Sequence, residues 1–345
     1  MAATEFYDSP LEKLIGLRDG ELDPSIPENV PDIAIDGGGM KSIIAVGALK
    51  ELHEEGLLQQ APRITAISGG TPAATAAMTG QFCEIQQTFE YDLPESKFID
   101  FSRLFKGKPV VQLPILEQTL RSGLDTKAVI DSSQELVFGV TRLSEGLEPQ
   151  TVSTRDIKED ELVSWIMRGM HMPRVAGRPT PDKSGDVYVD GGLSWLTTPE
   201  LAFSLGANSV LNISNVPPKK WQVDKAQTDF VGRWLNKMGA PNCAEMYRNF
   251  AIRQMYIINQ GFPSNVQIIS PSANSELPGT LETSPRKIHA GFIAGQNAVR
   301  AALQRTLIEV PQRPQPNKSI VVQASRQIAQ FVGPRALSAA FTLIP

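Results

Sequence analysis

The stretch Ile64-Thr-Ala-Ile-Ser-Gly-Gly-Thr71 decides how this chain folds. Its β-branched run predicts a strand, and Pro72 with the alanine-rich segment up to Ala77 predicts a helix directly after it. Ser68 lies on the turn between them, close to the free N–H groups at the start of the helix. This position has two interpretations: an elbow that presents the hydroxyl as a nucleophile, or a tight turn whose serine caps the helix. The full G-x-S-x-G pattern is absent, because Ala66 occupies the position of the first glycine.

The residues before this stretch have the same order of strand, turn and helix. Asp32–Asp36 predicts a short strand, Gly37-Gly38-Gly39 ends it, and the apolar spacing from Ile43 onward predicts a helix packed on a sheet. Arg63–Ile67 and Pro72–Gly80 then give a second strand and a second helix. This alternation favours the α/β class, with a three-layer α/β/α arrangement around a mainly parallel central sheet. Both glycine-rich turns then lie at the same sheet edge, where such sheets bind their ligands.

The remainder of the chain divides into further predicted elements. Strands are predicted at 136–142, 149–154, 186–189, 209–214 and 266–270, and helices at 161–170, 198–205 and 288–307. The segment 216–262 is rich in aromatic residues and methionine, and we interpret it as helices inserted over the sheet edge. We therefore expect an N-terminal arm (1–30), one domain with this insertion (31–308), and a proline-rich linker with a C-terminal tail (309–345).

Composition excludes several classes of protein. The 345 residues are 41% apolar and 20% charged, and the net charge of −4 lacks the basic surplus of nucleic-acid binders. Cys83 and Cys243 are too few and too far apart for a disulfide framework or a Cys-x-x-Cys metal site, so we expect no metal and no cofactor. The N-terminus lacks the pattern of a secretory signal, and no apolar run reaches the length of a membrane span. We expect a cytoplasmic protein in which any contact with lipid is peripheral, at a membrane surface.

The loop Asp36-Gly-Gly-Gly-Met-Lys-Ser42 does not fit a phosphate-binding loop. A P-loop needs glycine directly before the Lys-Ser pair, where this sequence has Met40, and the G-x-G-x-x-G spacing also fails. Three consecutive glycines before a helix instead leave backbone N–H groups free to converge on an anionic oxygen, as an oxyanion hole requires. Asp190, followed by two glycines, is either a turn former or a base that orients and deprotonates Ser68.

In this order, the motifs resemble those of the patatin-like phospholipase family. The resemblance rests on Asp36-Gly-Gly-Gly-Met-Lys41, on Ser68 within Ala-Ile-Ser-Gly-Gly, on Met172-Pro173 and on Asp190-Gly-Gly. It extends from about Pro31 to Leu303. It implies a patatin-like fold and a serine acyl hydrolase that cleaves carboxylic esters of lipids with a Ser-Asp dyad.

The resemblance also implies a role for each matching residue. Ser68 would be the nucleophile that forms an acyl-enzyme, and Asp190 the base. Lys41 would hold the glycine loop or the charge near it. The oxyanion hole would consist of the N–H groups of Gly37, Gly38 and Gly39, and the general logic of the elbow adds Gly69.

Two alternatives to this interpretation remain open. Ala66 and Ser42 depart from the family pattern, where glycines are usual, and a catalytically weakened lipid-binding or scaffold protein would tolerate both changes. A triad esterase is the second alternative, because Ser68, Asp190 and His289 follow the chain order of α/β-hydrolase triads.

Two segments are candidates for contact with lipid. The helices expected within 216–262 form an acyl-chain pocket, a mobile cover or a second core layer. Phenylalanines and basic residues occur together within 98–108, so this segment either lies on an anionic bilayer surface or is a solvated helix face with a buried stripe. The sequence assigns no oligomeric state.

Overall fold

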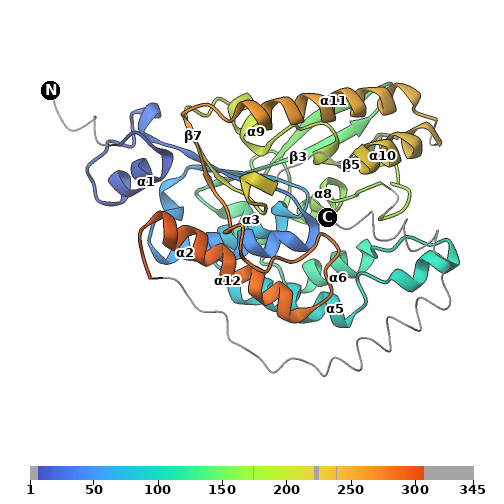
Figure 1. Cartoon of the computed structure of the whole chain (residues 1–345), viewed down its shortest axis with the longest axis horizontal. Helices are drawn as coiled ribbons and strands as arrows, with labels where there is room; N and C mark the ends of the chain where they lie inside the picture. The colour runs from blue at the N-terminus through green and yellow to red at the C-terminus, as the bar shows by residue number, and fades with distance from the viewer. Residues whose placement is uncertain (1–6, 174, 221–224, 238, 307–345) are drawn as a thin grey trace.

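A seven-stranded sheet forms the centre of the fold (Figure 1). The computed structural model describes residues 7–306 apart from 174, 221–224 and 238. The expected linker and tail at 309–345 lie outside the described residues, as do residues 1–6 of the expected arm. The strands are β1 (Asp32–Ile35), β2 (Arg63–Ile67), β3 (Glu135–Leu143), β4 (Leu147–Ser153), β5 (Val187–Asp190), β6 (Val210–Ile213) and β7 (Val266–Ile269).

The structure has helices where the sequence predicts them, and it adds α4 to α7 between β2 and β3, where no helix is predicted. The α-helices are α1 (Pro10–Arg18), α2 (Ile43–Glu54), α3 (Gly70–Thr79), α4 (Phe82–Gln87), α5 (Leu93–Glu95), α6 (Leu113–Gly123), α7 (Thr126–Asp131), α8 (Glu159–Gly169), α9 (Thr198–Ser204), α10 (Lys225–Lys237), α11 (Pro241–Gln260) and α12 (Pro285–Ala302). The short 3-10 helices are η2 (Pro27–Asn29), η3 (Gly39–Ser42), η4 (Leu58–Gln60), η6 (Phe101–Lys106), η7 (Gly191–Leu193) and η8 (Pro218–Lys220), and η5 (Thr88–Asp92) is a π-helix.

The sheet is mainly parallel, as predicted. Its strand order is β4-β3-β2-β1-β6-β7, and every pair from β3 to β7 in this order is parallel. Only β4 and β5 run antiparallel, both against β3. The carboxyl ends of β1 and β2 therefore lie side by side, which brings the turns after them to one edge of the sheet.

Side chains of β1 alternate between two cores, one on each face of the sheet. Ile33 and Ile35 belong to the large core that includes residues of α2 and α12, whereas Ala34 packs with Ala202 of α9 on the other face. Figure 1 shows α2 and α12 side by side below the sheet and α9 and α11 above it. The expected three-layer α/β/α fold is confirmed, since a strand buried on both faces needs helices on both sides.

The strand β5 meets β2 end to end along β3. Residue Gly139 of β3 pairs with Ile67, the last residue of β2, and the next residue, Val140, pairs with Asp190, the last residue of β5. Because β5 runs antiparallel to β3 and β2 runs parallel to it, their carboxyl ends point toward each other. This register brings Ser68 and Asp190 together, although they are 122 residues apart in the chain.

Several elements differ from the prediction at their ends. The helix expected from Pro72 begins two residues earlier, at Gly70, so the turn after β2 is tighter than expected. The segment expected to be helical within 216–262 contains α10 and α11, which pack against Leu147 of β4 and Val189 of β5. Among the described residues, no helix has both the length and the apolar character that a membrane span requires.

Candidate active site

Ser68 adopts a backbone conformation that residues other than glycine rarely take. Its φ is 54°, in the left-handed region, and its carbonyl accepts a hydrogen bond from the N–H of Thr71 at 2.9 Å. The helix α3 begins two residues later, with Gly69 as its N-cap. Holding a serine in this conformation costs about 1–3 kcal/mol, and such strain is concentrated at functional sites. The turn is therefore an elbow, with its serine at the apex.

The Asp190 side chain lies beneath this elbow and is almost completely buried, at 1% exposure. The Ser68 hydroxyl donates a hydrogen bond to Oδ2 of Asp190 at 2.5 Å. The N–H of Gly192 donates to the other carboxyl oxygen, Oδ1, at 2.8 Å, and the N–H of Asp190 itself donates to the carbonyl of His171 at 3.2 Å. Both carboxyl oxygens thus have a fixed partner, which orients one of them at the serine.

Burial raises the pKa of Asp190 to about 6, because the carboxylate loses its hydration in this position. The hydrogen bonds from Ser68 and Gly192 act in the opposite direction and offset only part of this effect. The carboxyl group therefore accepts a proton more readily than an exposed aspartate does. Titratable groups with shifted pKa values in such positions are candidates for proton transfer.

The tri-glycine loop after β1 lies directly against the elbow. A Cβ atom on Gly37 would lie 2.9 Å from the Cβ atom of Ser68, and one on Gly69 would lie 2.9 Å from the backbone nitrogen of Gly39. Only glycine allows the two loops to approach this closely. Within the described residues, the N–H groups of Gly37, Gly38 and Gly69 donate no hydrogen bond to protein. The described part of the protein therefore leaves the hydrogen-bonding capacity of these three N–H groups unused.

A buried polar cluster holds the tri-glycine loop in place, and sequence reasoning missed it. The side chain Nδ2 of Asn215 donates to the carbonyl of Asp36 at 2.6 Å and to that of Gly37 at 3.2 Å. The Asp36 carboxyl group accepts hydrogen bonds from Thr198 Oγ1 at 2.8 Å and from Asn212 Nδ2 at 3.4 Å. Burial raises the pKa of Asp36. The signal in the sequence was the polar Asn212 and Asn215 at the end of the predicted strand 209–214.

Lys41 lies at the start of the helix that follows the loop. Its N–H donates to the carbonyl of Gly38 at 3.2 Å, and burial lowers the pKa of its ammonium group. A Cβ atom on Gly38 would lie 3.2 Å from the Cβ of Lys41, so the lysine stem packs against the loop. Lys41 is therefore next to the glycine loop, where its charge is less hydrated than that of an exposed lysine.

The imidazole rings of the three histidines have partners away from the Ser68–Asp190 pair. His289 Nδ1 lies 2.9 Å from Oε1 of the buried Glu90 on η5. The ring of His171 is 3.2 Å from the carbonyl of Gly177, and burial lowers its pKa. His53 is exposed and contacts Gln59. The carboxylate that a triad would need for His289 is hydrogen-bonded to Ser68 directly.

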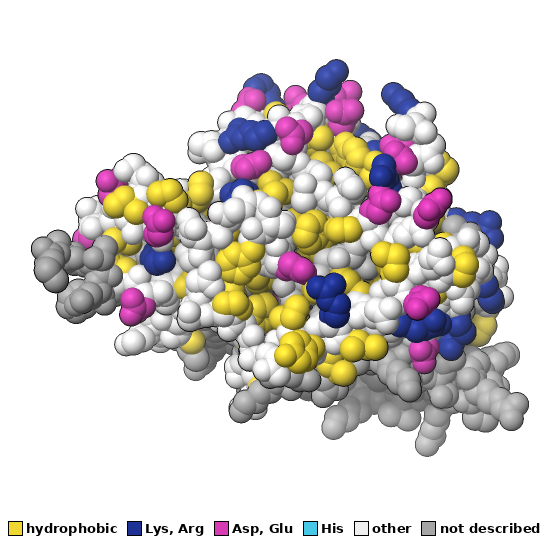
Figure 2. Space-filling model, turned by 90° about the horizontal axis from the view of Figure 1, so that it is seen from above, with side chains coloured by type: hydrophobic (Ala, Val, Ile, Leu, Met, Phe, Trp, Pro, Cys, Tyr) yellow, Lys and Arg dark blue, Asp and Glu magenta, His cyan; other side chains and the backbone are white. Residues whose placement is uncertain are grey.

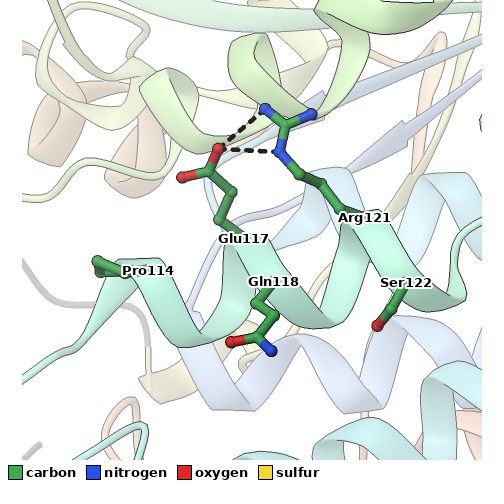
Figure 3. A pocket seen from close by; sticks show the side chains of 5 residues that line it. All are labelled: Pro114, Glu117, Gln118, Arg121 and Ser122. Carbon is green, nitrogen blue, oxygen red and sulfur yellow. Dashed lines mark hydrogen bonds and ion pairs between the residues drawn. The ribbon is translucent and has the colours of Figure 1, made fainter.

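Two surface hollows occur at some distance along the chain from this pair. One, of about 390 Å³, runs along α6 and is lined by five residues of that helix, with an ion pair between Glu117 and Arg121 (Figure 3). The other, of about 530 Å³, is lined by six residues that include His289, Glu90 and Cys83. Neither hollow is lined by Ser68 or Asp190. No group of three or more possible metal ligands is found among the residues that the structure describes.

The helices α10 and α11 cover the aspartate side of the site. Their side chains form a core with Val189 and Leu193, the residues on either side of the Asp190 turn, and Tyr247 of α11 packs against this core. Burial raises the pKa of Tyr247 to about 12, and the negative charge of Asp190 adds to the effect.

Comparison with known proteins identifies the family of this chain. Among solved structures it is similar to VipD from Legionella pneumophila, with 12% identity, a TM-score of 0.44, and coverage of 79% of this chain and 67% of VipD. It is also similar to human GIVD cytosolic phospholipase A2 in complex with methyl gamma-linolenyl fluorophosphonate, with 11% identity and a TM-score of 0.43. That match covers 86% of this chain but only 62% of the phospholipase chain.

No curated protein matches the sequence. The model of the family described as patatin-like phospholipase matches residues 33–203, and the chain therefore belongs to the patatin-like phospholipase family of enzymes.

Proposed function

We propose that this protein hydrolyses carboxylic esters of lipids, with Ser68 as nucleophile and Asp190 as base. The observation that carries the proposal is the hydrogen bond of 2.5 Å from the Ser68 hydroxyl to the Asp190 carboxyl group, formed at the apex of a strained elbow. Membership of a phospholipase family supports a lipid as the substrate.

The reaction would proceed in two steps through an acyl-enzyme. In the first, Ser68 Oγ attacks the ester carbonyl carbon while its proton passes to Oδ2 of Asp190, and the alcohol leaves with that proton. In the second, water attacks the acyl-enzyme, gives a proton to Asp190, and releases the fatty acid while Ser68 regains its hydroxyl. An ordinary aspartate is far too weak a base for this task, and the raised pKa of Asp190 supports its role as proton acceptor.

The negative charge that develops on the carbonyl oxygen needs hydrogen-bond donors beside Ser68. The N–H groups of Gly37, Gly38, Gly39 and Gly69 are the proposed donors. The close approach of Gly37 to Ser68 and of Gly39 to Gly69 supports this assignment. Donors that are held in place before the reaction are worth several kcal/mol in such sites, about 3–4 kcal/mol for one donor. Asn215, by fixing the loop, would act as a positioning residue.

We also propose that residues 31–308 form one catalytic domain, with α10 and α11 as its insertion. The family match ends at residue 203, but β6 and β7 extend the same sheet beyond it, and α12 packs in the same core as α2. The apolar side chains of α10 and α11 beside Asp190 would then contact the acyl chain of the substrate.

Labelling by a fluorophosphonate probe tests whether Ser68 is an activated nucleophile. We expect the wild-type protein to react at Ser68, as peptide mapping by mass spectrometry would reveal, because only an activated serine reacts readily. The variant Ser68→Ala should remain unlabelled, and Ser122→Ala, which removes a serine from the surface of α6, should be labelled like the wild type. Absence of labelling in folded wild-type protein would contradict the proposal and favour the scaffold alternative.

The variant His289→Gln separates the dyad from the triad. Glutamine can keep a hydrogen bond to the buried Glu90, so the fold around η5 is preserved while the imidazole is lost. We expect kcat/KM for a soluble ester to change by less than about tenfold, whereas removal of a triad histidine costs about a thousandfold or more. A loss of that larger size, in protein with unchanged circular dichroism, would support the triad and refute the dyad.

A further inference from the structure

An exposed apolar loop projects from the body of the protein at residues 97–108, and we call it the projecting loop. It contains η6, in which no residue is buried. Phe101, Leu104 and Phe105 on this short helix are 40%, 50% and 74% exposed. Figure 1 shows this segment, in cyan to teal after α5, at the right-hand side of the molecule. A helical turn with three large apolar side chains in solvent is unusual and marks an interaction surface.

The backbone of the projecting loop is ordered by hydrogen bonds, so the exposure is a property of its folded state. The N–H of Asp100 donates to Val110 at 3.0 Å and that of Gln112 to Phe98 at 2.8 Å, which closes the base of the loop. At the tip, the N–H of Gly107 donates to Leu104 at 3.0 Å. The loop therefore presents its apolar side chains on a defined scaffold.

Charge on the projecting loop is opposite in sign to that of the whole chain. It carries four basic side chains, Lys97, Arg103, Lys106 and Lys108, and a single acidic one, Asp100, whereas the chain has a net charge of −4. The three lysines are exposed. Arg103 donates to the carbonyl of Pro109 at 2.7 Å and belongs to the scaffold. Apolar side chains flanked by lysines are the combination that binds an anionic lipid surface.

The helix α11 also exposes large apolar side chains, but in a different electrostatic setting. They include Ile252 and Tyr256, which are 62% and 66% exposed. Figure 2 shows the face that carries α11 from above, and acidic and basic side chains are interspersed there among the hydrophobic ones. Such a mixed surface lacks the positive bias of the projecting loop. The projecting loop is therefore the better candidate for contact with an anionic surface.

A short series of hydrogen bonds connects the base of the projecting loop to Asp190. The N–H of Val111 donates to the carbonyl of Val175 at 2.9 Å, two residues from Gly177. The carbonyl of Gly177 lies 3.2 Å from the ring of His171, and the carbonyl of His171 accepts a hydrogen bond from the N–H of Asp190. The loop and the Ser68–Asp190 pair are thus both attached, by these hydrogen bonds, to His171, Val175 and Gly177 or their close neighbours.

We propose that the projecting loop docks the protein on an anionic membrane, with Leu104 and Phe105 inserted among the lipids and Lys106 and Lys108 at the phosphate groups. This inference rests on the proposed function for one point: the membrane would supply the lipid ester that the enzyme cleaves. The docking surface itself is independent of whether Ser68 reacts.

Co-sedimentation with vesicles tests the docking. The probes are vesicles of ether-linked phosphatidylcholine, with or without ether-linked phosphatidylserine, which contain no ester to cleave, so binding is measured without catalysis. We expect the full chain to bind the phosphatidylserine vesicles more tightly. The double variant Leu104→Ser/Phe105→Ser should bind them about tenfold or more weakly, and Lys106→Gln/Lys108→Gln should lose about fivefold for each lysine. The control Ile26→Ser removes an exposed apolar residue (43% exposed) next to η2 and should bind like the wild type.

Three outcomes of the vesicle experiment would contradict membrane docking by the projecting loop. Unchanged binding by the Leu104→Ser/Phe105→Ser variant, or an equal loss in the Ile26→Ser control, would overturn the proposal. Absence of binding by the wild type would also overturn it and point to a protein as the partner of this surface. Hydrolysis of a soluble short-chain ester, measured in parallel, should be the same in all of these variants. If the wild type binds vesicles but cleaves no ester, the proposed function fails while the docking stands.

Discussion

Replacing Ser68 with alanine is expected to lower the turnover of a short-chain ester by about a thousandfold or more. The hydroxyl that donates to Asp190 at 2.5 Å is the only group at the elbow that would form the acyl bond. Its removal leaves a protein that can bind the ester but cannot form the acyl-enzyme. The loss should appear in kcat with little change in KM, because a single oxygen atom contributes little to binding of the acyl chain.

The same variant should fold normally. Alanine keeps the backbone of the elbow and removes one hydrogen bond, so we expect thermal unfolding to occur near the wild-type temperature. The surface variant Ser122→Ala is the matched control for activity. Wild-type activity in folded Ser68→Ala protein would contradict the assignment of the nucleophile. A loss that is accompanied by unfolding would be resolved by Ser68→Cys, which retains a nucleophile at the same position.

The layers of the fold are predictable because the spacing of apolar residues indicates which faces of the strands and helices are buried. Strand, glycine turn and helix follow one another twice between Asp32 and Thr79, and only a parallel sheet with helices on both faces accommodates this order. The direction of β5 was not predictable. A strand of four residues, Val187–Asp190, has the same apolar pattern in either orientation, and its orientation depends on pairing with β3 beyond Gly139.

Only those residues of the candidate site that belong to local sequence motifs could be predicted. Ser68, Asp190 and the tri-glycine loop carry local signatures, because a tight turn or a close approach restricts the sequence around each of them. Asn215 carries no such signature. Its side chain binds the backbone of Asp36, 179 residues earlier in the chain, and only the neighbouring positions of β1 and β6 in the sheet bring the two together. Contacts of this kind depend on the tertiary structure.

Replacing Asp190 with asparagine is expected to have opposite effects on activity and on stability. Asparagine has the same shape and can still accept a hydrogen bond from Ser68, but it cannot take up a proton. A general base contributes about a hundredfold to ten-thousandfold to the rate, and we expect a loss in kcat/KM of that size. In the wild type, kcat/KM should fall as the pH drops through about 6, the pKa of Asp190, because the protonated carboxyl group is no longer a base.

The stability effect follows from the direction of the pKa shift. The folded protein raises the pKa of Asp190 from 3.8 to about 6, so it binds this proton more tightly than the unfolded chain does. Ionisation of the buried carboxyl group therefore opposes folding at pH values above the pKa that Asp190 has in the unfolded chain. The free-energy cost reaches its full size above the pKa that Asp190 has in the folded protein. This rise in the pKa corresponds to about 3 kcal/mol. Near about pH 8, Asp190→Asn should increase the free energy of unfolding by about 1–3 kcal/mol, and this gain should vanish as the pH falls toward about 4.

Urea unfolding of the wild type and of Asp190→Asn at several pH values measures this difference. The control is Asp131→Asn at the exposed end of α7, where the carboxylate forms an ion pair with Lys127 and its removal should change stability by about 0.5 kcal/mol or less. A lower stability of Asp190→Asn at all pH values would mean that the hydrogen bonds of the carboxylate outweigh its burial. In that case the charge on Asp190 would help to hold the fold together, and the base of the proposed reaction would have a pKa close to that of an ordinary aspartate.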